Sequence, residues 1–203
     1  MPVPQKLPEI IIGSDEALKG DTFGGIVVAA VKAGPNERKM LQELGVCDSK
    51  TLSDKKILLL ARKLKLLPHV IISLSPQEYN QHQGSITLLL NDLHTKAALS
   101  LKPGFHIVDE YPGCTAGDAH ETKAESKYLE VAAASILARA AALRQIEELS
   151  QKAGFIIPKG STHVKIALEQ LKQKKLPIKD FVKLNFKNVK DFFNTQSPPT
   201  VLS

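Results

Sequence analysis

The apolar positions of this chain fall into short runs that are either continuous or spaced as on one face of a helix. Continuous β-branched runs predict buried strands. They lie at 10–12, 26–31, 70–74 and 105–111. Runs with helical spacing predict helices. They lie at 40–44, 54–66, 85–99, 129–150 and 164–174, with a short helix opening at 75–78 and a last amphipathic segment over 177–193. Strands that alternate with helices are typical of an α/β fold.

Polar, glycine-containing segments separate these elements. The segment 32–38 holds Gly34 and Pro35 and predicts a loop. The segment 111–121 predicts a second loop, and a short strand is expected near 120–123. No repeat or low-complexity tract interrupts this order, so the pattern predicts one folded domain.

Composition narrows the class of protein. The chain has 203 residues, of which 43% are hydrophobic and 24% charged, as in ordinary globular proteins. No apolar run approaches the ~20 residues of a membrane span, and the N-terminus lacks the apolar core of a signal peptide. Two cysteines cannot form a disulfide framework. We therefore expect a soluble, cytoplasmic protein with one domain over 1–195 and a disordered tail over 196–203, without membrane contact.

Positive charge is concentrated late in the chain. The formal net charge is +6. Residues 159–190 carry nine lysines against two acids, Glu169 and Asp180. Such a basic stretch suits phosphate contacts, although a solvated amphipathic helix face has the same composition.

Acidic residues follow two of the predicted strands. Asp15 and Glu16 come shortly after the strand at 10–12, at a charged elbow before the strand at 26–31. Asp109 stands at the end of the strand at 105–111. Buried carboxylates are unfavourable unless a cation or good hydrogen bonds hold them. Because acids at the ends of neighbouring strands can meet at one sheet edge, Asp15 and Asp109 are expected to converge on a metal site. A solvated turn is the alternative for the Asp15 pair.

Glu125 is the fourth candidate acid. It precedes the predicted helix 129–150, whose first half is apolar on nearly all sides. A carboxylate here could join the other acids, or it could serve only as a negative charge at the positive end of the helix dipole.

These motifs, in this order, resemble the ribonuclease HII/HIII family. They are Gly13-Ser14-Asp15-Glu16, Gly20-Asp21-Thr22-Phe23-Gly24, Asp48-Ser49-Lys50-Thr51-Leu52-Ser53, Val108-Asp109, Thr122-Lys123-Ala124-Glu125, Ala132-Ala133-Ala134-Ser135-Ile136-Leu137-Ala138-Arg139 and Pro158-Lys159-Gly160-Ser161. The resemblance implies a ribonuclease H-like α/β fold, with a central mixed β-sheet flanked by helices and a helical, basic C-terminal region over about 159–193.

Within that family the chain looks more like ribonuclease HIII than HII. The G-D-x-F-G elbow, Glu125 within T-K-A-E, the P-K-G loop and Asn185-Phe186-Lys187-Asn188 carry this similarity. Type HII enzymes have G-R-G where this chain has Leu18-Lys19-Gly20, so reading of an RNA-DNA junction is not expected. Typical HIII proteins also have an N-terminal substrate-binding domain, and because few residues precede Asp15, we do not expect such a domain here. The basic C-terminal region is expected to compensate.

The resemblance implies an endoribonuclease that hydrolyses the RNA strand of RNA/DNA hybrids with two Mg²⁺ or Mn²⁺ ions, leaving 3′-hydroxyl and 5′-phosphate ends. The implied catalytic and metal-binding residues are Asp15, Glu16, Asp109 and Glu125. The expected substrate contacts are Leu18, Lys19, Gly20, Lys50, Lys127, Lys159 and Ser161. A monomer is expected. Incision at single ribonucleotides in DNA, or hybrid binding without catalysis, are the alternatives.

Overall fold

The computed structural model describes residues 7–195. The tail predicted to be disordered, 196–203, lies outside the described residues. The chain divides into two compact units. The first, here called the sheet unit, takes the chain up to Ala17, Val27–Ser73 and Gln83–Leu143. The second, the C-terminal unit, takes Leu18–Ile26, Leu74–His82 and the chain from Arg144. A single domain over 1–195 stays a prediction.

A five-stranded sheet forms the centre of the fold, in the order β3-β2-β1-β4-β5. The strands are β1 (Ile11–Ala17), β2 (Ile26–Ala33), β3 (His69–Leu74), β4 (Phe105–Asp109) and β5 (Ala119–Glu121). β1 pairs with β2 antiparallel and with β4 parallel, and β4 pairs with β5 parallel. The prediction of an α/β fold with a mixed sheet is therefore confirmed.

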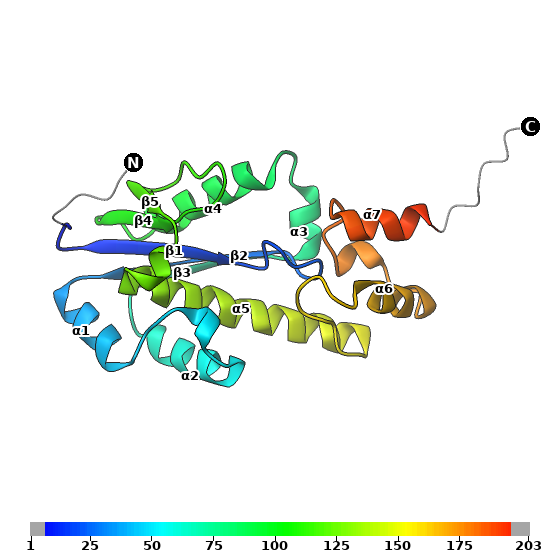
Figure 1. Ribbon diagram of the computed structural model, residues 1–203, viewed down its shortest axis with the longest axis horizontal. Helices are drawn as coiled ribbons and strands as arrows, with labels where there is room; N and C mark the ends of the chain where they lie inside the picture. The colour runs from blue at the N-terminus through cyan, green and yellow to red at the C-terminus, as the bar shows by residue number, and fades with distance from the viewer. Residues whose placement is uncertain (1–6, 196–203) are drawn as a thin grey trace, which may run out of the picture. The chain divides into compact units, whose positions relative to one another are not determined.

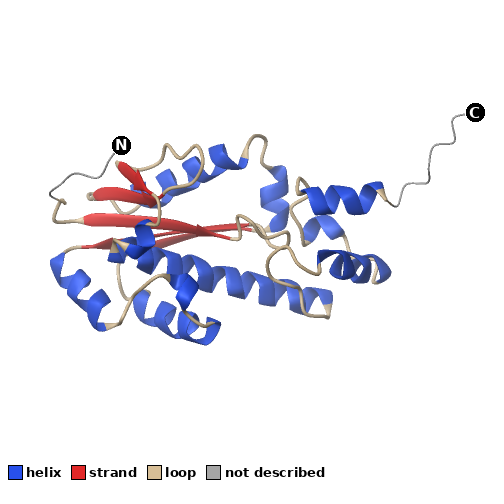
Figure 2. Ribbon diagram, in the orientation of Figure 1, coloured by secondary structure: helices blue, strands red, loops and turns tan. Residues whose placement is uncertain are grey.

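Helices flank the sheet on both sides (Figure 2). In the sheet unit they are α1 (Pro35–Glu43), α2 (Asp54–Leu64), α4 (Ile86–Leu99) and the first part of α5 (Leu129–Ala153). Figure 1 shows α4 on one side of the sheet and α1, α2 and α5 on the other. At Gly13 of β1, an added Cβ would lie 2.3 Å from the backbone nitrogen of Val131 in α5. Only glycine lets β1 and α5 approach this closely.

Two predictions about local structure were wrong. The predicted elbow at Asp15 and Glu16 is part of β1, because both residues continue the antiparallel ladder with Ala29 and Val28. The predicted loop at 32–38 contains the start of α1, because Pro35 suits the first helical position and the Glu37 carboxylate accepts from the Gly34 backbone N–H at 2.9 Å.

The C-terminal unit is mainly helical, as the resemblance implied. It contains α3 (Pro76–Gln81), the end of α5, α6 (Val164–Gln173), a 3₁₀ turn at Ile178–Asp180 and α7 (Lys187–Asn194). Eight of the nine lysines in 159–190 are exposed, but Lys183 is fully buried. No helix within residues 7–195 is both long and apolar enough to cross a membrane.

Candidate active site

Strand β1 presents its two acids to opposite faces of the sheet, because successive side chains in a strand alternate. Asp15 shares the face of Gly13, which packs on α5, and it receives a hydrogen bond from Ser135 of α5. Glu16 faces α4, where its Oε2 lies 3.3 Å from Nε2 of His94. The parallel register pairs Ser14 with Val108, so Asp15 and Asp109 follow at the same level of neighbouring strands.

Asp15 is a buried carboxyl whose ionised form is opposed by its neighbours. Burial raises the pKa of this carboxyl well above its usual range, and repulsion from Glu16 and Asp109 raises it further. Hydrogen bonds from Ser135 and from the Glu16 backbone N–H, at 2.7 Å, partly offset these effects. The centre of the cluster therefore favours a cation or a proton.

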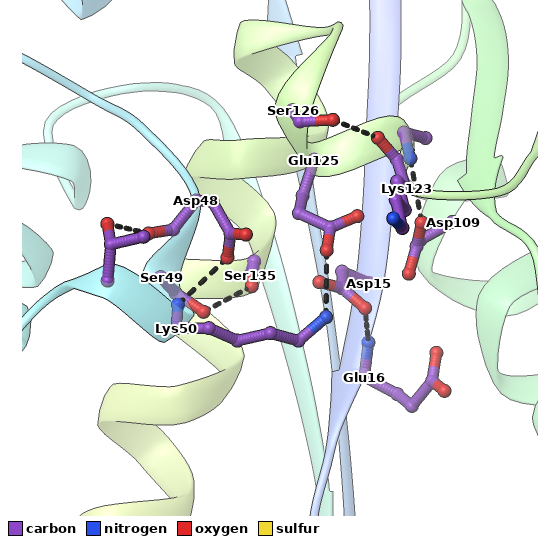
Figure 3. A network of polar contacts seen from close by, with 12 residues as sticks. Asp15, Glu16, Asp48, Ser49, Lys50, Asp109, Lys123, Glu125, Ser126 and Ser135 are labelled. Atoms are coloured by element: carbon purple, nitrogen blue, oxygen red, sulfur yellow. Dashed lines mark hydrogen bonds and ion pairs between the residues drawn. The ribbon is translucent and has the colours of Figure 1, made fainter.

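Asp109 and Glu125 form the second half of the cluster (Figure 3). The Ala124 backbone N–H donates to Asp109 Oδ1 at 2.8 Å. Burial, and hydrogen bonding to Glu125, raise the pKa of Asp109 to about 7. Burial also acts on Glu125, but hydrogen bonds with Lys50 and Asp109 outweigh it and lower the pKa of Glu125. Of these two acids, Asp109 is therefore the one that holds a proton more readily.

Lys50 is the cation that the structure brings to this cluster. Its Nζ donates to Glu125 Oε1 at 2.8 Å, and this hydrogen bond raises the pKa of Lys50. The short 3₁₀ turn Ser49–Thr51 that carries Lys50 is anchored twice: Ser49 Oγ lies 2.7 Å from Ser135 Oγ, and Arg139 donates to the Ser49 carbonyl oxygen. Glu125 lies in a separate 3₁₀ turn, Ala124–Ser126, and not at the end of α5.

The donor set fits hard divalent cations such as Mg²⁺ or Mn²⁺, which prefer carboxylate oxygens. Glu125 Oε2 is buried and has no hydrogen-bond partner among the residues described. A cation is a natural partner for such a buried carboxylate oxygen. Among residues 7–195, however, no three His, Cys, Asp or Glu side chains already stand as a finished ligand set.

The expected substrate contacts occupy both units. Lys50 and Lys127 belong to the sheet unit, are exposed and pair with Glu125 and Glu121 respectively. Leu18, Lys19, Gly20, Lys159 and Ser161 belong to the C-terminal unit.

Within that unit two of these segments are tied together. The Gly160 backbone N–H donates to Asp21 Oδ1 at 2.6 Å, and the Thr22 N–H donates to the Gly160 carbonyl oxygen. The structure therefore joins 18–22 to 159–161, although 139 residues separate Asp21 from Gly160 in sequence.

Sequence reasoning missed the polar residues that support the acids. Ser135 was part of a family motif but had no assigned role, and His94 stood inside an apolar helical pattern. Ser14 precedes the acid pair and contacts His94 at 2.7 Å. The useful signal was periodicity: Ser14 and Glu16 lie two residues apart in a strand and so share one face.

The sequence matches the family Ribonuclease HII over residues 12–111 and 115–189. The chain belongs to the ribonuclease HII family. It is 37% identical to ribonuclease HIII from Bacillus cereus (strain ATCC 10987 / NRS 248), over 90% of this chain and 68% of that protein.

Solved structures agree with this membership. The fold is similar to Bst-RNase HIII in complex with Mn²⁺, with a TM-score of 0.83 and 31% identity over 94% of this chain and 71% of that one. It is also similar to ribonuclease H2 from Pyrococcus horikoshii OT3, with a TM-score of 0.77 and 25% identity over 92% of this chain and 98% of that one. This member of the ribonuclease HII family is an endoribonuclease, a hydrolase with ribonuclease H activity.

Proposed function

We propose that this endoribonuclease hydrolyses the RNA strand of RNA/DNA hybrids with two divalent cations, Mg²⁺ or Mn²⁺, and leaves 3′-hydroxyl and 5′-phosphate ends. The observation that carries the proposal is the buried carboxylate cluster, in which Asp15 is opposed by two other acids and Glu125 Oε2 lacks a partner among the described residues. The Mn²⁺ complex of Bst-RNase HIII supports the choice of cation.

The residues that would hold the cations are Asp15, Glu16, Asp109 and Glu125. Bound divalent cations supply charge neutralisation at the scissile phosphate and activation of a water molecule. The chain's own contribution is orientation. Ser135 and the Glu16 N–H fix Asp15, the Ala124 N–H fixes Asp109, and Lys50 fixes Glu125.

Hybrid recognition would use both the backbone and the 2′-hydroxyls of the RNA strand. Main-chain groups of 18–20 are proposed for the 2′-hydroxyls. Gly20 is exposed, and a Cβ added there would meet nothing within 4 Å, so its backbone is open to approach. Lys50, Lys127, Lys159 and Ser161, all exposed, are proposed for phosphates.

The test compares two labelled substrates, a continuous RNA/DNA hybrid and a DNA duplex with one ribonucleotide, each with Mg²⁺ and separately with Mn²⁺. We expect cation-dependent cleavage of the hybrid and no incision of the second substrate. Incision at the single ribonucleotide would assign type HII specificity to Leu18-Lys19-Gly20. If neither substrate is cut, the proposed substrate is wrong.

We also propose that the enzyme acts as a monomer in the reducing cytoplasm. Cys47 and Cys114 are both free, which suits a reducing compartment. The molar mass of the purified chain, measured by light scattering at several concentrations, tests whether it is a monomer.

A further inference from the structure

A continuous chain of buried polar contacts ends at Glu16. His94 Nε2 lies 3.3 Å from Glu16 Oε2, and His94 Nδ1 lies 2.7 Å from Ser14 Oγ. The same Ser14 Oγ lies 2.7 Å from His106 Nε2. Ser14, His94 and His106 are at most 3% exposed. Buried polar groups are unfavourable unless hydrogen-bonded, and here each group meets the next.

The backbone fixes each member of this chain. Ser14 and Glu16 share one face of β1, α4 packs against that face and carries His94, and His106 lies beside them on β4. The ring of His94 also packs against that of Tyr111, with a centroid separation of 5.4 Å. At the far end, the His106 backbone N–H donates to Asp118 Oδ2 at 2.7 Å, and Lys102 donates to the same oxygen at 3.0 Å.

The hydrogen-bonding chemistry allows one direction of donation along this series of buried contacts. An ionised carboxylate only accepts, so the His94 Nε2 that faces Glu16 must carry hydrogen. In a His94 ring with hydrogen on Nε2 alone, the opposite nitrogen, Nδ1, is an acceptor, and the Ser14 hydroxyl donates to it. Ser14 in turn accepts from His106 Nε2–H. Burial, together with the neighbouring His94, lowers the pKa of His106 to about 3, so its ring is neutral and carries a single hydrogen.

We propose that Ser14 and His106 fix His94 with Nε2–H toward Glu16, and that His94 is thereby a positioning residue that orients the Glu16 carboxylate for a divalent cation. The inference rests on the proposed function for its last step, cation binding by Glu16. Carboxylate ligands commonly depend on such outer hydrogen bonds, whose loss weakens metal binding about 10- to 100-fold.

Two substitutions at His94 separate positioning from simple packing. The amide nitrogen of glutamine reaches the place of histidine Nε2, so His94→Gln keeps a donor to Glu16. Asparagine reaches only the place of Nδ1, so His94→Asn keeps the Ser14 contact and loses the Glu16 contact. By calorimetry, we expect His94→Asn to weaken Mn²⁺ binding about 10- to 100-fold and His94→Gln to bind nearly as tightly as the parent.

The matched control is His69→Asn, because His69 lies in the same unit and its ring Nδ1 contacts the Leu67 carbonyl oxygen at 2.8 Å, away from the acids. It should leave Mn²⁺ affinity unchanged. A folded His94→Asn variant that binds Mn²⁺ as the parent does would overturn the proposal. Failure of the unsubstituted protein to bind Mn²⁺ at all would instead contradict the proposed function.

A measurement on the unsubstituted, cation-free protein covers the case in which His94→Asn fails to fold. Nitrogen-15 spectra of labelled histidine report which ring nitrogen carries hydrogen. We expect Nε2–H for both His94 and His106. A His94 ring with hydrogen on Nδ1 alone cannot donate to Glu16, and this result would overturn the inference whether or not the enzyme cleaves hybrids.

Discussion

The two units bury charge in opposite ways. In the sheet unit, four acids gather beside Lys50, which donates to Glu125, and burial together with the neighbouring acids raises the pKa values of Asp15 and Asp109. In the described part of the C-terminal unit, Lys183 is buried, and its side chain donates to a backbone oxygen rather than to an acid. Its Nζ donates to the Asp21 carbonyl oxygen at 2.5 Å and lies 5.6 Å and 5.1 Å from the ring centroids of Tyr79 and Phe186.

The difference indicates two kinds of role. The acids repel one another, and one of their oxygens has no hydrogen-bond partner among the described residues, so the cluster suits the proposed divalent cations. Lys183 instead meets a carbonyl and two aromatic faces, and its backbone N–H also donates to the Thr22 carbonyl oxygen at 3.0 Å. It belongs to the framework that holds the segment 18–22.

The largest expected effect comes from Asp15→Asn. Loss of a metal ligand should lower hybrid cleavage at least about 10³-fold, or about 4 kcal/mol in the barrier. Hybrid binding should persist, and thermal stability should hold or rise because a repelled buried charge is gone. Single-turnover cleavage and a binding titration check this. Asp92→Asn, at an exposed acid on α4, is the matched control; equal turnover in both variants would remove Asp15 from the site.

Lys183→Met tests the other unit through the pH dependence of stability. Burial lowers the pKa of Lys183 to about 7 in the folded chain, against 10.5 for an ordinary lysine. Between these values the unfolded chain binds a proton that the folded chain does not, so this lysine makes stability rise with pH. Between pH 7 and pH 10, the free energy of unfolding of the parent should therefore rise by on the order of 3 kcal/mol relative to that of Lys183→Met.

Urea unfolding at several pH values measures that difference. The exposed Lys190 of α7 provides the control, because Lys190→Met should run parallel to the parent at every pH. Parallel curves for Lys183→Met as well would show that Lys183 keeps its proton in the folded state.

Mn²⁺ binding should offset the electrostatic repulsion among the clustered acids. Folded Asp109 holds its proton up to about pH 7, whereas an ordinary aspartate loses it near 3.8, so unfolding releases a proton between these values. The cation-free protein therefore loses stability as pH rises from 4 to 7. At pH 8, Mn²⁺ at 100 times its Kd should raise the free energy of unfolding by about 2.7 kcal/mol. The same Mn²⁺ concentration should raise it less at pH 5, where the cation must displace the proton.

Thermal unfolding with and without Mn²⁺ gives both quantities, and Asp109→Asn should flatten the decline of the cation-free protein. If Mn²⁺ raises the free energy of unfolding by the same amount at pH 5 and pH 8, its binding does not displace a proton from Asp109.

The sequence was most informative where a local pattern sufficed. β-branched runs and helical periodicity located the sheet and its covering helices, since these depend on neighbours along the chain. The length of β1 was not predictable this way, because Asp15 and Glu16 remain in the strand only through pairing with Ala29 and Val28 of β2. Tertiary pairing overrode the polar character of those residues.

The acids of the candidate site could be named from motifs, but their supports could not. Lys183 looked like one more lysine of a basic surface, and its burial depends on Asp21, Tyr79 and Phe186, which are far from one another in sequence. His94 had no signal beyond one polar position in an apolar helix. Contacts of this kind depend on the packing of distant segments, which a single sequence does not encode locally.

The smallest expected effect concerns Leu18, which has a positive φ of 67° although it is not glycine. That conformation costs a leucine about 1 kcal/mol, while burial of its side chain, only 8% exposed, contributes about 1.5–3 kcal/mol. Leu18→Gly relieves the strain but loses the burial, so it should destabilise by roughly 1 kcal/mol. Leu18→Ala loses the burial and keeps the strain, so it should destabilise by about 1 kcal/mol more. Urea unfolding gives the free energy of unfolding of both variants, and the difference between the two values measures the backbone strain. Equal values would mean that the backbone at position 18 relaxes without a glycine.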